Sequence, residues 1–381
     1  MNKISITVLF LSLALSACSL RESTSPTKVV NTQTILFDCK MNQPQVLKTA
    51  TLLPFEDSQV ITYEMLVEKK LFKHLRNVEI TVLGSNNNSR SFIYSSEQLK
   101  RFTQVSLKNL PIVNADIVDK SNSKKYTEQS LMFFRLGIEE TSFSPTSITH
   151  TFNLATPCQP MQYSVQLSSL LPLILSSPVK GEGWNALNEG TSQYLAHRRS
   201  VFIDKSETLY IPQHYAIDFS RSRLEWMYYP RIVLSALFSN SLDKTYDADV
   251  FAVADGVVVA VINNLPEKKP LRTQNIEKPS LKSLTGNYII YKMDNGKFAF
   301  YGHLQPNSIK VKVGDNIVKD QLIALVGNSG NSIAPHLHFS VNETAEKLQS
   351  EGIPFVFDNF TTQAKDYSHK RQKPSSTVTF K

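Results

Sequence analysis

The chain has 381 residues, of which 41% are hydrophobic and 19% are charged. This length suffices for two domains of ordinary size, and the composition excludes a chain that is disordered along most of its length. The net charge of +8 favours anionic partners. No nucleic-acid motif or aromatic-basic cluster accompanies the charge, so we expect no nucleic-acid partner.

The first residues predict the compartment. Lys3 precedes an apolar run, residues 4–15, that is too short to cross a bilayer. This pattern predicts a secretory signal peptide at residues 1–17, which is removed from the mature chain. The signal ends in Leu-Ser-Ala-Cys18, which resembles the bacterial lipobox. The resemblance implies a lipid on the Cys18 sulfur, and an ordinary signal peptide is the alternative.

A lipid on Cys18 would hold the chain on a membrane of the bacterial cell envelope. Residues 18–33 are rich in Ser and Thr, which predicts a flexible tether between the lipid and the first domain. Ser19 stands where a signal for inner-membrane retention is often Asp, so we expect the outer membrane, facing the periplasm, if the cell is Gram-negative. The anionic partners expected there are lipid headgroups, teichoic acids and peptidoglycan.

Short apolar and β-branched runs, separated by turn-forming clusters, fill residues 34–160. Examples are residues 60–63, 78–83 and 147–152. This spacing predicts a mostly β accessory domain, in which the lone His150 is structural or solvated. Cys39 and Cys158 lie near the two ends of this domain. Because a secreted compartment is oxidising, we expect a disulfide between them, and two unpaired thiols are the alternative.

A second domain rich in short strands is predicted for residues 161–345. Asp294-Asn295-Gly296 separates two apolar runs, which is a strong hairpin signal. Asp255-Gly256 likewise separates residues 250–254 from residues 257–262, which predicts two strands around a tight turn. The chain as a whole is therefore predicted to be mostly β.

Three segments lack this pattern of short strands. Residues 220–247 predict a partly helical insertion. Residues 263–285 contain three prolines and several lysines, which predicts a long surface loop. Residues 346–381 are polar and basic, which predicts a partly disordered tail.

Four of the eight histidines fall in three short patterns of the second domain. The patterns are His214-x-x-x-Asp218, Tyr-Gly-His303-Leu and His336-Leu-His338-Phe. On a strand, residues at even offsets face the same side. His336 and His338 would therefore project together, and so would His214 and Asp218 if the chain is extended there.

These five groups suit a zinc site. Zinc takes imidazole nitrogen and carboxylate oxygen as ligands, and a hydrolytic site combines three protein ligands with a water. Histidines that are not ligands can position that water or take its proton. The spacing leaves open which of the five groups are ligands. The alternative is a β domain whose histidines lie on its strands without a functional role.

Residues 311–339, which end in Asn-Ser-Gly-Asn-Ser-Ile-Ala-Pro-His-Leu-His-Phe, resemble the signature of the M23 peptidases, the LytM- or lysostaphin-like family. The segments Tyr-Gly-His303-Leu, Ala254-Asp-Gly-Val-Val and His214-x-x-x-Asp218 match further parts of the family pattern in the right order. The resemblance covers about residues 178–342. It implies a compact antiparallel β-sheet domain with a groove across the metal.

The resemblance also implies a role for each site residue. One zinc ion per chain would be bound by His214, Asp218 and His338, and His303 and His336 would be the catalytic histidines. Such a chain would be a zinc metalloendopeptidase that hydrolyses peptide bonds in peptidoglycan stems or cross-links. The alternative is a catalytically silent LytM-type envelope module that regulates a cell-wall amidase, with other cell-wall enzymes as partners.

Several features of this chain depart from the family pattern. Ala216 and Ala334 stand where glycines are usual, and the insertions at residues 220–247 and 263–285 lie where the walls of the groove would be. The substrate specificity is therefore open. His197 is a further candidate for lining the groove, with a surface or core histidine as an equally favoured alternative.

Overall fold

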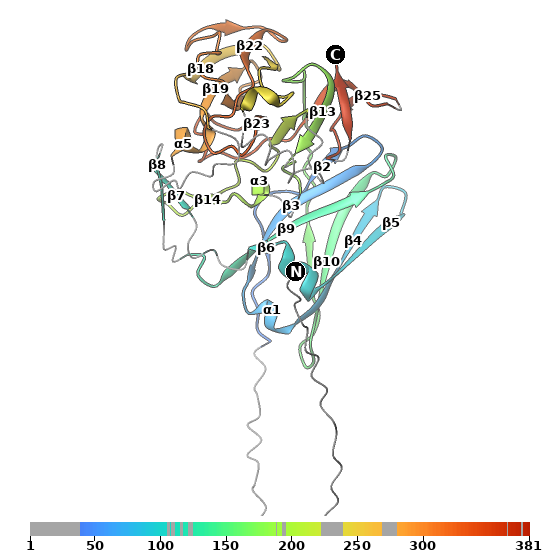
Figure 1. The fold of residues 1–381 in the computed structure, drawn as a ribbon. Coiled ribbons are helices and arrows are strands. Elements are labelled where there is room, and N and C mark those ends of the chain that lie inside the picture. Colours follow the sequence, from blue (N-terminus) through green and yellow to red (C-terminus); the bar gives the residue numbers. More distant parts are fainter. Residues whose placement is uncertain are drawn as a thin grey trace, which may run out of the picture. The chain divides into compact units, whose positions relative to one another are not determined.

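The computed structural model describes residues 39–104, 107, 111–114, 117–120, 125–187, 189–192, 196–221, 239–268, 280–363, 365–374 and 376–381. The predicted signal peptide, the tether and Cys18 lie outside these residues. Residues 39–381 form one compact unit (Figure 1). Within the described part of the chain, no helix has the length and hydropathy that a membrane-spanning helix requires.

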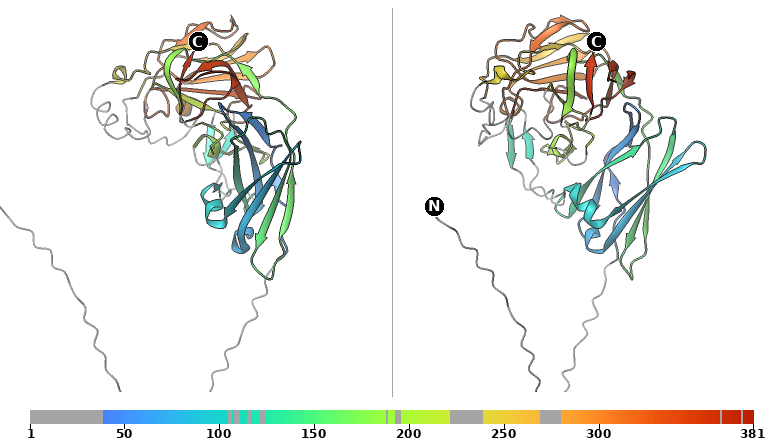
Figure 2. Two further views of the ribbon diagram at one scale, coloured as in Figure 1. Left: turned by 90° about the vertical axis from the view of Figure 1, so that its right-hand side faces the viewer. Right: turned by 45° about the vertical axis from the view of Figure 1, so that its right-hand side comes forward.

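The prediction of a mostly β chain is confirmed, because short helices only punctuate a series of largely antiparallel strands. The N-terminal region, residues 39–165, contains a five-stranded and a four-stranded sheet, whose long strands are the blue-to-green arrows of Figures 1 and 2. Its elements are β1 Gln45–Val46, β2 Thr51–Pro54, β3 Gln59–Glu68, α1 Leu71–His74, β4 Leu75–Gly84, β5 Ser89–Ser95, α2 Ser96–Arg101, β6 Thr103–Gln104, β7 Pro111–Asn114, β8 Ile117–Lys120, β9 Gln129–Ile138, β10 Pro145–Leu154 and β11 Met161–Val165.

Strand β3 has two buried faces with different partners. Its odd-numbered apolar residues pack into the core of the N-terminal region together with residues of β4, β9 and β10. Its even-numbered residues face the rest of the chain: Val60 joins the core of the C-terminal region, and Thr62 and Glu64 are buried polar groups. Because side chains alternate across a strand, β3 joins the two regions of the molecule.

The N-terminal region is also closed by a covalent link. The structure contains the disulfide between Cys39 and Cys158, two residues separated by 119 positions in the sequence. Cys158 is buried in the core of this region, and Cys39 packs against the same core. The link ties the start of the described chain to the segment that follows β10.

The C-terminal region, residues 173–381, is built on an eleven-stranded sheet with the order β12-β24-β26-β13-β16-β23-β20-β19-β18-β21, with β25 paired to β24. Its elements are β12 Leu173–Leu175, β13 Gly181–Leu187, α3 Ala196–Arg199, β14 Phe202–Ile203, β15 Leu209–Tyr210, β16 Ile217–Ser220, a 3₁₀ turn Asn240–Leu242, β17 Asp249–Phe251, β18 Gly256–Ile262, α5 Leu281–Thr285, β19 Asn287–Met293, β20 Phe298–Leu304, β21 Asn316–Ile317, β22 Leu322–Leu325, β23 Leu337–Asn342, β24 Phe355–Thr361, β25 Asp366–Lys370 and β26 Thr377–Phe380.

The strand pairing confirms one predicted hairpin and corrects another. β19 and β20 pair with each other around Asp294-Asn295-Gly296. β17 and β18 do not pair across Asp255-Gly256: β17 pairs with β22, and β18 pairs with β19 and β21. The physical reason lies just before the turn, where the N–H of Val253 donates to the buried hydroxyls of Tyr291 and Tyr301 at 2.9 and 3.1 Å. These bonds hold the chain in a bend that sends the two strands to different sheets.

The predicted disorder of the tail at residues 346–381 is wrong for the described residues. β24, β25 and β26 lie in this segment, and Phe355, Phe357 and Phe380 are at most 1% exposed in the core of the C-terminal region. The prediction of disorder was based on the polar and basic residues of the tail. Burial of each aromatic side chain stabilises the fold by about 1.5–3 kcal/mol, which outweighs the solvated charges between them.

Candidate metal centre and active site

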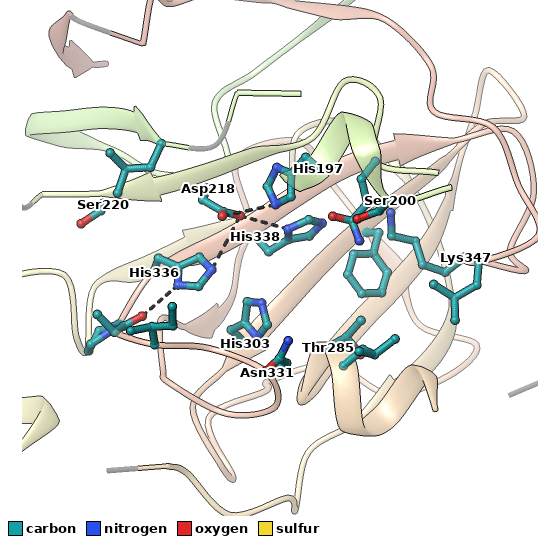
Figure 3. A pocket seen from close by; sticks show the side chains of 18 of the residues that line it. His197, Ser200, Asp218, Ser220, Thr285, His303, Asn331, His336, His338 and Lys347 are labelled. Atoms are coloured by element: carbon teal, nitrogen blue, oxygen red, sulfur yellow. Dashed lines mark hydrogen bonds and ion pairs between the residues drawn. The ribbon is translucent and has the colours of Figure 1, made fainter. Parts of the chain in front are cut away.

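Three adjacent strands, β16, β23 and β20, carry the centre of the site. Asp218 on β16 lies directly opposite His338 on β23, and His338 lies opposite Gly302 on β20. Side chains of directly opposed residues in an antiparallel pair point to the same face. The Nδ1 atom of His338 is consequently 3.0 Å from Oδ1 of Asp218 (Figure 3).

His336 precedes β23 and projects to the same side as His338, as its even offset predicts. Its Nε2 atom is 3.6 Å from Oδ1 of Asp218, and its Nδ1 atom is 2.8 Å from the carbonyl oxygen of Ala334. The turn before it contains Gly330 at φ +72°, a conformation that favours glycine. Gly330 therefore allows the turn that leads to His336.

His303 lies near the end of β20, and its ring centroid is 4.6 Å from that of His336. The backbone of His303 has φ +61°, a sparsely populated conformation for a residue with a side chain. Its Nδ1 atom is 2.8 Å from the carbonyl oxygen of Ser329. The hydroxyl of Ser329 in turn donates to the carbonyl of Leu304 at 2.7 Å, so the ring is fixed to the strand that carries it.

His197 is the candidate site residue for which the sequence equally favoured a role as a surface or core histidine. It lies on α3, and its Nε2 atom is 3.3 Å from Oδ2 of Asp218, whereas the contact of His338 at 3.0 Å is to Oδ1. The ring centroids of His197 and His338 are 4.8 Å apart. His197 is in no strand pattern and in no motif of the resemblance, so the sequence contains no signal that distinguishes it from a core histidine.

The position of His197 depends on its neighbour Arg198, which is fully buried. The guanidinium donates to Oε1 of Glu64 on β3 at 2.8 Å. It also donates to the backbone carbonyls of Tyr63 at 2.8 Å and Phe134 at 2.7 Å. Two strands of the N-terminal region thus hold the short helix that presents His197 to Asp218.

The structure differs from the prediction at His214, which does not join this group. Its Nε2 atom is 3.0 Å from the hydroxyl of Thr62 and 3.3 Å from Oε1 of Glu64, and it lines a separate cavity of about 660 Å³. The physical reason is local. Residues 212–215 form a turn and β16 begins at Ile217, so the even-offset rule for an extended chain does not apply.

The donor set of His197, Asp218 and His338 fits a zinc ion. One ligand atom from each lies within 4.8 Å of the others, and all three side chains are buried. Two imidazoles and one carboxylate are ligands that zinc accepts. Among the described residues, the Nδ1 atom of His197 has no hydrogen-bond partner although it is buried. His150 in the core of the N-terminal region has the same unpartnered Nδ1, so it is the distances from His197 to Asp218 and His338, and not this atom, that place His197 in the donor set.

The electrostatics of the site favour the forms that bind a metal. Burial alone would raise the pKa of Asp218, but the nearby His197 and His336 and the hydrogen bonds from His197 and His338 hold it well below its usual range. Burial lowers the pKa of His338 to about 3. Burial, with the proximity of His336 and His338, also lowers the pKa of His303 well below its usual range. At neutral pH the carboxylate is therefore ionised and these rings are neutral.

These groups line one cavity of about 300 Å³. His197, Asp218, His303, His336 and His338 are all among its lining residues, and His214 is not. Leu284 and Thr285, from helix α5, form part of its wall. The insertion at residues 263–285 therefore contributes to the groove wall, as the sequence predicted. Residues 222–238 of the other insertion lie outside the described residues.

Comparisons with known proteins match a part of the chain to one family model. Residues 240–350 match the family model described as Peptidase family M23. A curated relative, the peptidoglycan DD-endopeptidase ShyC of Vibrio cholerae, is 31% identical over 93 residues, which are 24% of this chain and 21% of the relative. The chain thus spans only about a fifth of the length of that relative.

Two solved structures are similar to parts of the chain. The catalytic domain of lysostaphin from Staphylococcus simulans is 21% identical, with 37% of this chain and 75% of that chain covered and a TM-score of 0.23. A putative M23 peptidase from Pseudomonas aeruginosa is 13% identical, with 69% and 82% covered and a TM-score of 0.26.

Proposed function

We propose, from the membership of residues 240–350 in peptidase family M23, that this chain is a zinc-dependent endopeptidase that hydrolyses peptide bonds in peptidoglycan stems or cross-links. The observation that carries the proposal is the gathering of Asp218 and four histidines in one cavity. The peptidoglycan substrate is suggested by the name of the Vibrio cholerae relative.

His197, Asp218 and His338 would hold the zinc ion. When bound, zinc would supply a Lewis acid that polarises a substrate carbonyl and lowers the pKa of a water. The low pKa of Asp218 and the neutral ring of His338 prepare these residues to act as ligands without first losing a proton. Arg198 would act by positioning His197, because its guanidinium is bonded to Glu64 and to the backbone of β3 and β9.

His303 and His336 would move the protons of the reaction. In each ring Nδ1 lies 2.8 Å from a backbone carbonyl, which can only accept a hydrogen bond, so Nδ1 carries the proton in the neutral ring. Nε2 of each ring is then left with the lone pair. One of these atoms can take a proton from the attacking water, and the protonated ring can afterwards donate to the leaving amine.

The experiment that tests this proposal measures the hydrolysis of purified peptidoglycan and the zinc content of the same protein. We expect the wild-type chain to retain about one zinc and to release peptides, and His303→Ala to retain zinc and lose hydrolysis. A chain that binds zinc and releases no peptide from any peptidoglycan type would contradict the proposal.

One observation favours a second candidate, a catalytically silent module that regulates a cell-wall amidase. His214, which the family resemblance assigns to the metal, is held by Thr62 and Glu64 instead. A regulatory module would keep its effect on cell-wall cleavage in a His303→Ala variant, whereas a peptidase would lose it. The same variant therefore separates the two functions.

We also propose that a lipid on Cys18 anchors the chain in the cell envelope, on the outer membrane facing the periplasm in a Gram-negative cell. The lipobox resemblance supports this location, and the net charge of +8 suits the anionic surfaces found there. We expect Cys18→Ser to move the chain from the membrane fraction to the soluble fraction. An unchanged membrane fraction would contradict lipid anchoring.

A further inference from the structure

Lys347 is a buried lysine in the wall of the cavity that holds the five site residues. It follows β23 in the chain, it is 2% exposed, and it lines the cavity beside Phe300 and Leu348 (Figure 3). Its Nζ atom lies 5.0 Å from the centroid of the Phe300 ring. The mechanism described above does not use this group.

The ammonium of Lys347 has only neutral hydrogen-bond partners. Nζ donates to the hydroxyl of Ser340 at 2.7 Å and to the carbonyl of Pro212 at 3.3 Å. No carboxylate of the described residues lies within ion-pair distance of it. A buried ammonium without an anion is costly, and burial accordingly lowers the pKa of Lys347 to about 7. The cavity wall thus contains a lysine whose cationic form has no counter-ion among the described residues.

The position of this cation limits what can compensate it. Asp218 and Lys347 are the carboxylate and the ammonium among the described residues that line the cavity, and no other described lining residue is Asp, Glu, Lys or Arg. In the proposed function Asp218 binds the metal. An ammonium has three donors, and two of them go to Ser340 and Pro212. The third donor is left for a ligand that enters the cavity.

We propose that Lys347 forms a subsite for a free carboxylate of the substrate, so that the enzyme prefers peptides with a carboxylate close to the scissile bond. This inference rests on the proposed function and adds a substrate class to it. Phe202, Phe300 and Leu348 line the same cavity and belong to one apolar cluster. They would pack against the aliphatic part of the residue that carries the carboxylate.

A structural role for Lys347 is the competing explanation. The bonds to Ser340 and Pro212 tie the segment after β23 to the turn before β16. A lysine with that role alone would affect all substrates equally when it is replaced. A carboxylate subsite would instead affect substrates according to whether they carry the carboxylate.

The test compares two synthetic peptides of identical sequence that carry either a free carboxylate or a carboxamide on the side chain next to the scissile bond. We expect the wild-type enzyme to prefer the carboxylate peptide by about tenfold or more in kcat/KM, the size of one charge-assisted hydrogen bond. In Lys347→Met this preference should fall to about one. A third peptide carries its free carboxylate at the C-terminus instead of on the side chain. Comparison with the first peptide shows whether the subsite binds a side-chain or a C-terminal carboxylate.

Lys310→Met is the matched control, because Lys310 is exposed and does not line the cavity. It should keep the wild-type preference. Equal loss for both peptides in Lys347→Met would overturn the subsite in favour of the structural role. Equal kcat/KM for the two peptides in the wild-type enzyme would overturn it without any variant.

Binding measured by calorimetry separates this inference from the proposed function. If the wild-type chain cuts neither peptide, the peptidase proposal fails, and the subsite still predicts tighter binding of the carboxylate peptide than of the carboxamide peptide. Lys347→Met should remove that difference. Equal affinities for the two peptides in the wild-type chain would overturn the subsite.

Discussion

Asp218, His303, His336 and His338 lie on or beside three adjacent strands, whereas His197 and His214 lie in the segment between β13 and β16, where helices and strands are short. On the strands, cross-strand register alone brings the side chains together. In the other segment, contacts with the N-terminal region decide which histidine reaches Asp218. The comparison teaches that four of the five site residues are local to one sheet, whereas the position of the fifth, His197, depends on a distant part of the chain.

Loss of His303 should have the largest effect on activity, because it removes a proton-transfer group from the site residues that lie on the strands. We expect His303→Ala to lower kcat by about 10²–10⁴, the usual contribution of a general acid or base. Metal affinity should stay near the wild-type value. The measurement is steady-state hydrolysis beside a zinc titration, and a variant that loses zinc as well would show that His303 is a ligand.

Replacement of Arg198 tests whether the N-terminal region positions His197. Arg198→Met leaves the carboxylate of Glu64 buried without its cation, which should lower the free energy of unfolding by about 3–5 kcal/mol. Because α3 loses its anchor, metal affinity should fall by about 10- to 100-fold. Denaturant unfolding and a zinc titration measure the two effects.

Two further variants sharpen this test. Arg101→Met breaks an exposed pair with Glu97 and should change stability by less than about 0.5 kcal/mol. The double variant Arg198→Met with Glu64→Leu should regain stability, since no charge is left unpaired, and should not regain metal affinity. Full metal affinity in Arg198→Met would show that Arg198 does not position His197.

Replacement of His150 should have the smallest effect, which is on the pH dependence of stability. His150 also contrasts with the metal-site histidines. It is strand-borne and buried, its Nε2 atom is 2.7 Å from the hydroxyl of Tyr63, and burial lowers its pKa to about 3. The unfolded chain binds a proton at His150 near pH 6.5, so its neutral burial stabilises the fold above that pH. This contribution is lost as the pH falls below 6.5, by about 2–3 kcal/mol at pH 4.5.

The measurement for His150 is the stability difference between wild type and His150→Gln at pH 7.5 and pH 4.5. His150→Gln cannot be protonated, so its stability should fall less on acidification than that of the wild type. An equal fall in both proteins would show that His150 does not contribute to acid sensitivity.

The gathering of Asp218 and His303 with the other site residues was implied by the family resemblance, whereas the shared face of His336 and His338 and the mostly β fold followed from short-range pattern. The even offset of His336 and His338 and the turn at Asp294-Asn295-Gly296 are examples. Three features depended on contacts that no local pattern contains. They are the burial of Arg198 against β3, the hydrogen bond between His214 and Thr62, and the packing of Phe355 and Phe357 that orders the tail.

The central claim is that His197, and not His214, completes the metal centre with Asp218 and His338. The most direct measurement is the zinc affinity of His197→Ala and His214→Ala, determined by competition with a chelator. The account predicts that His197→Ala weakens zinc binding by more than about 100-fold, beyond what loss of a supporting residue costs, and that His214→Ala stays within about threefold of the wild type. A large loss in His214→Ala with wild-type affinity in His197→Ala would contradict it.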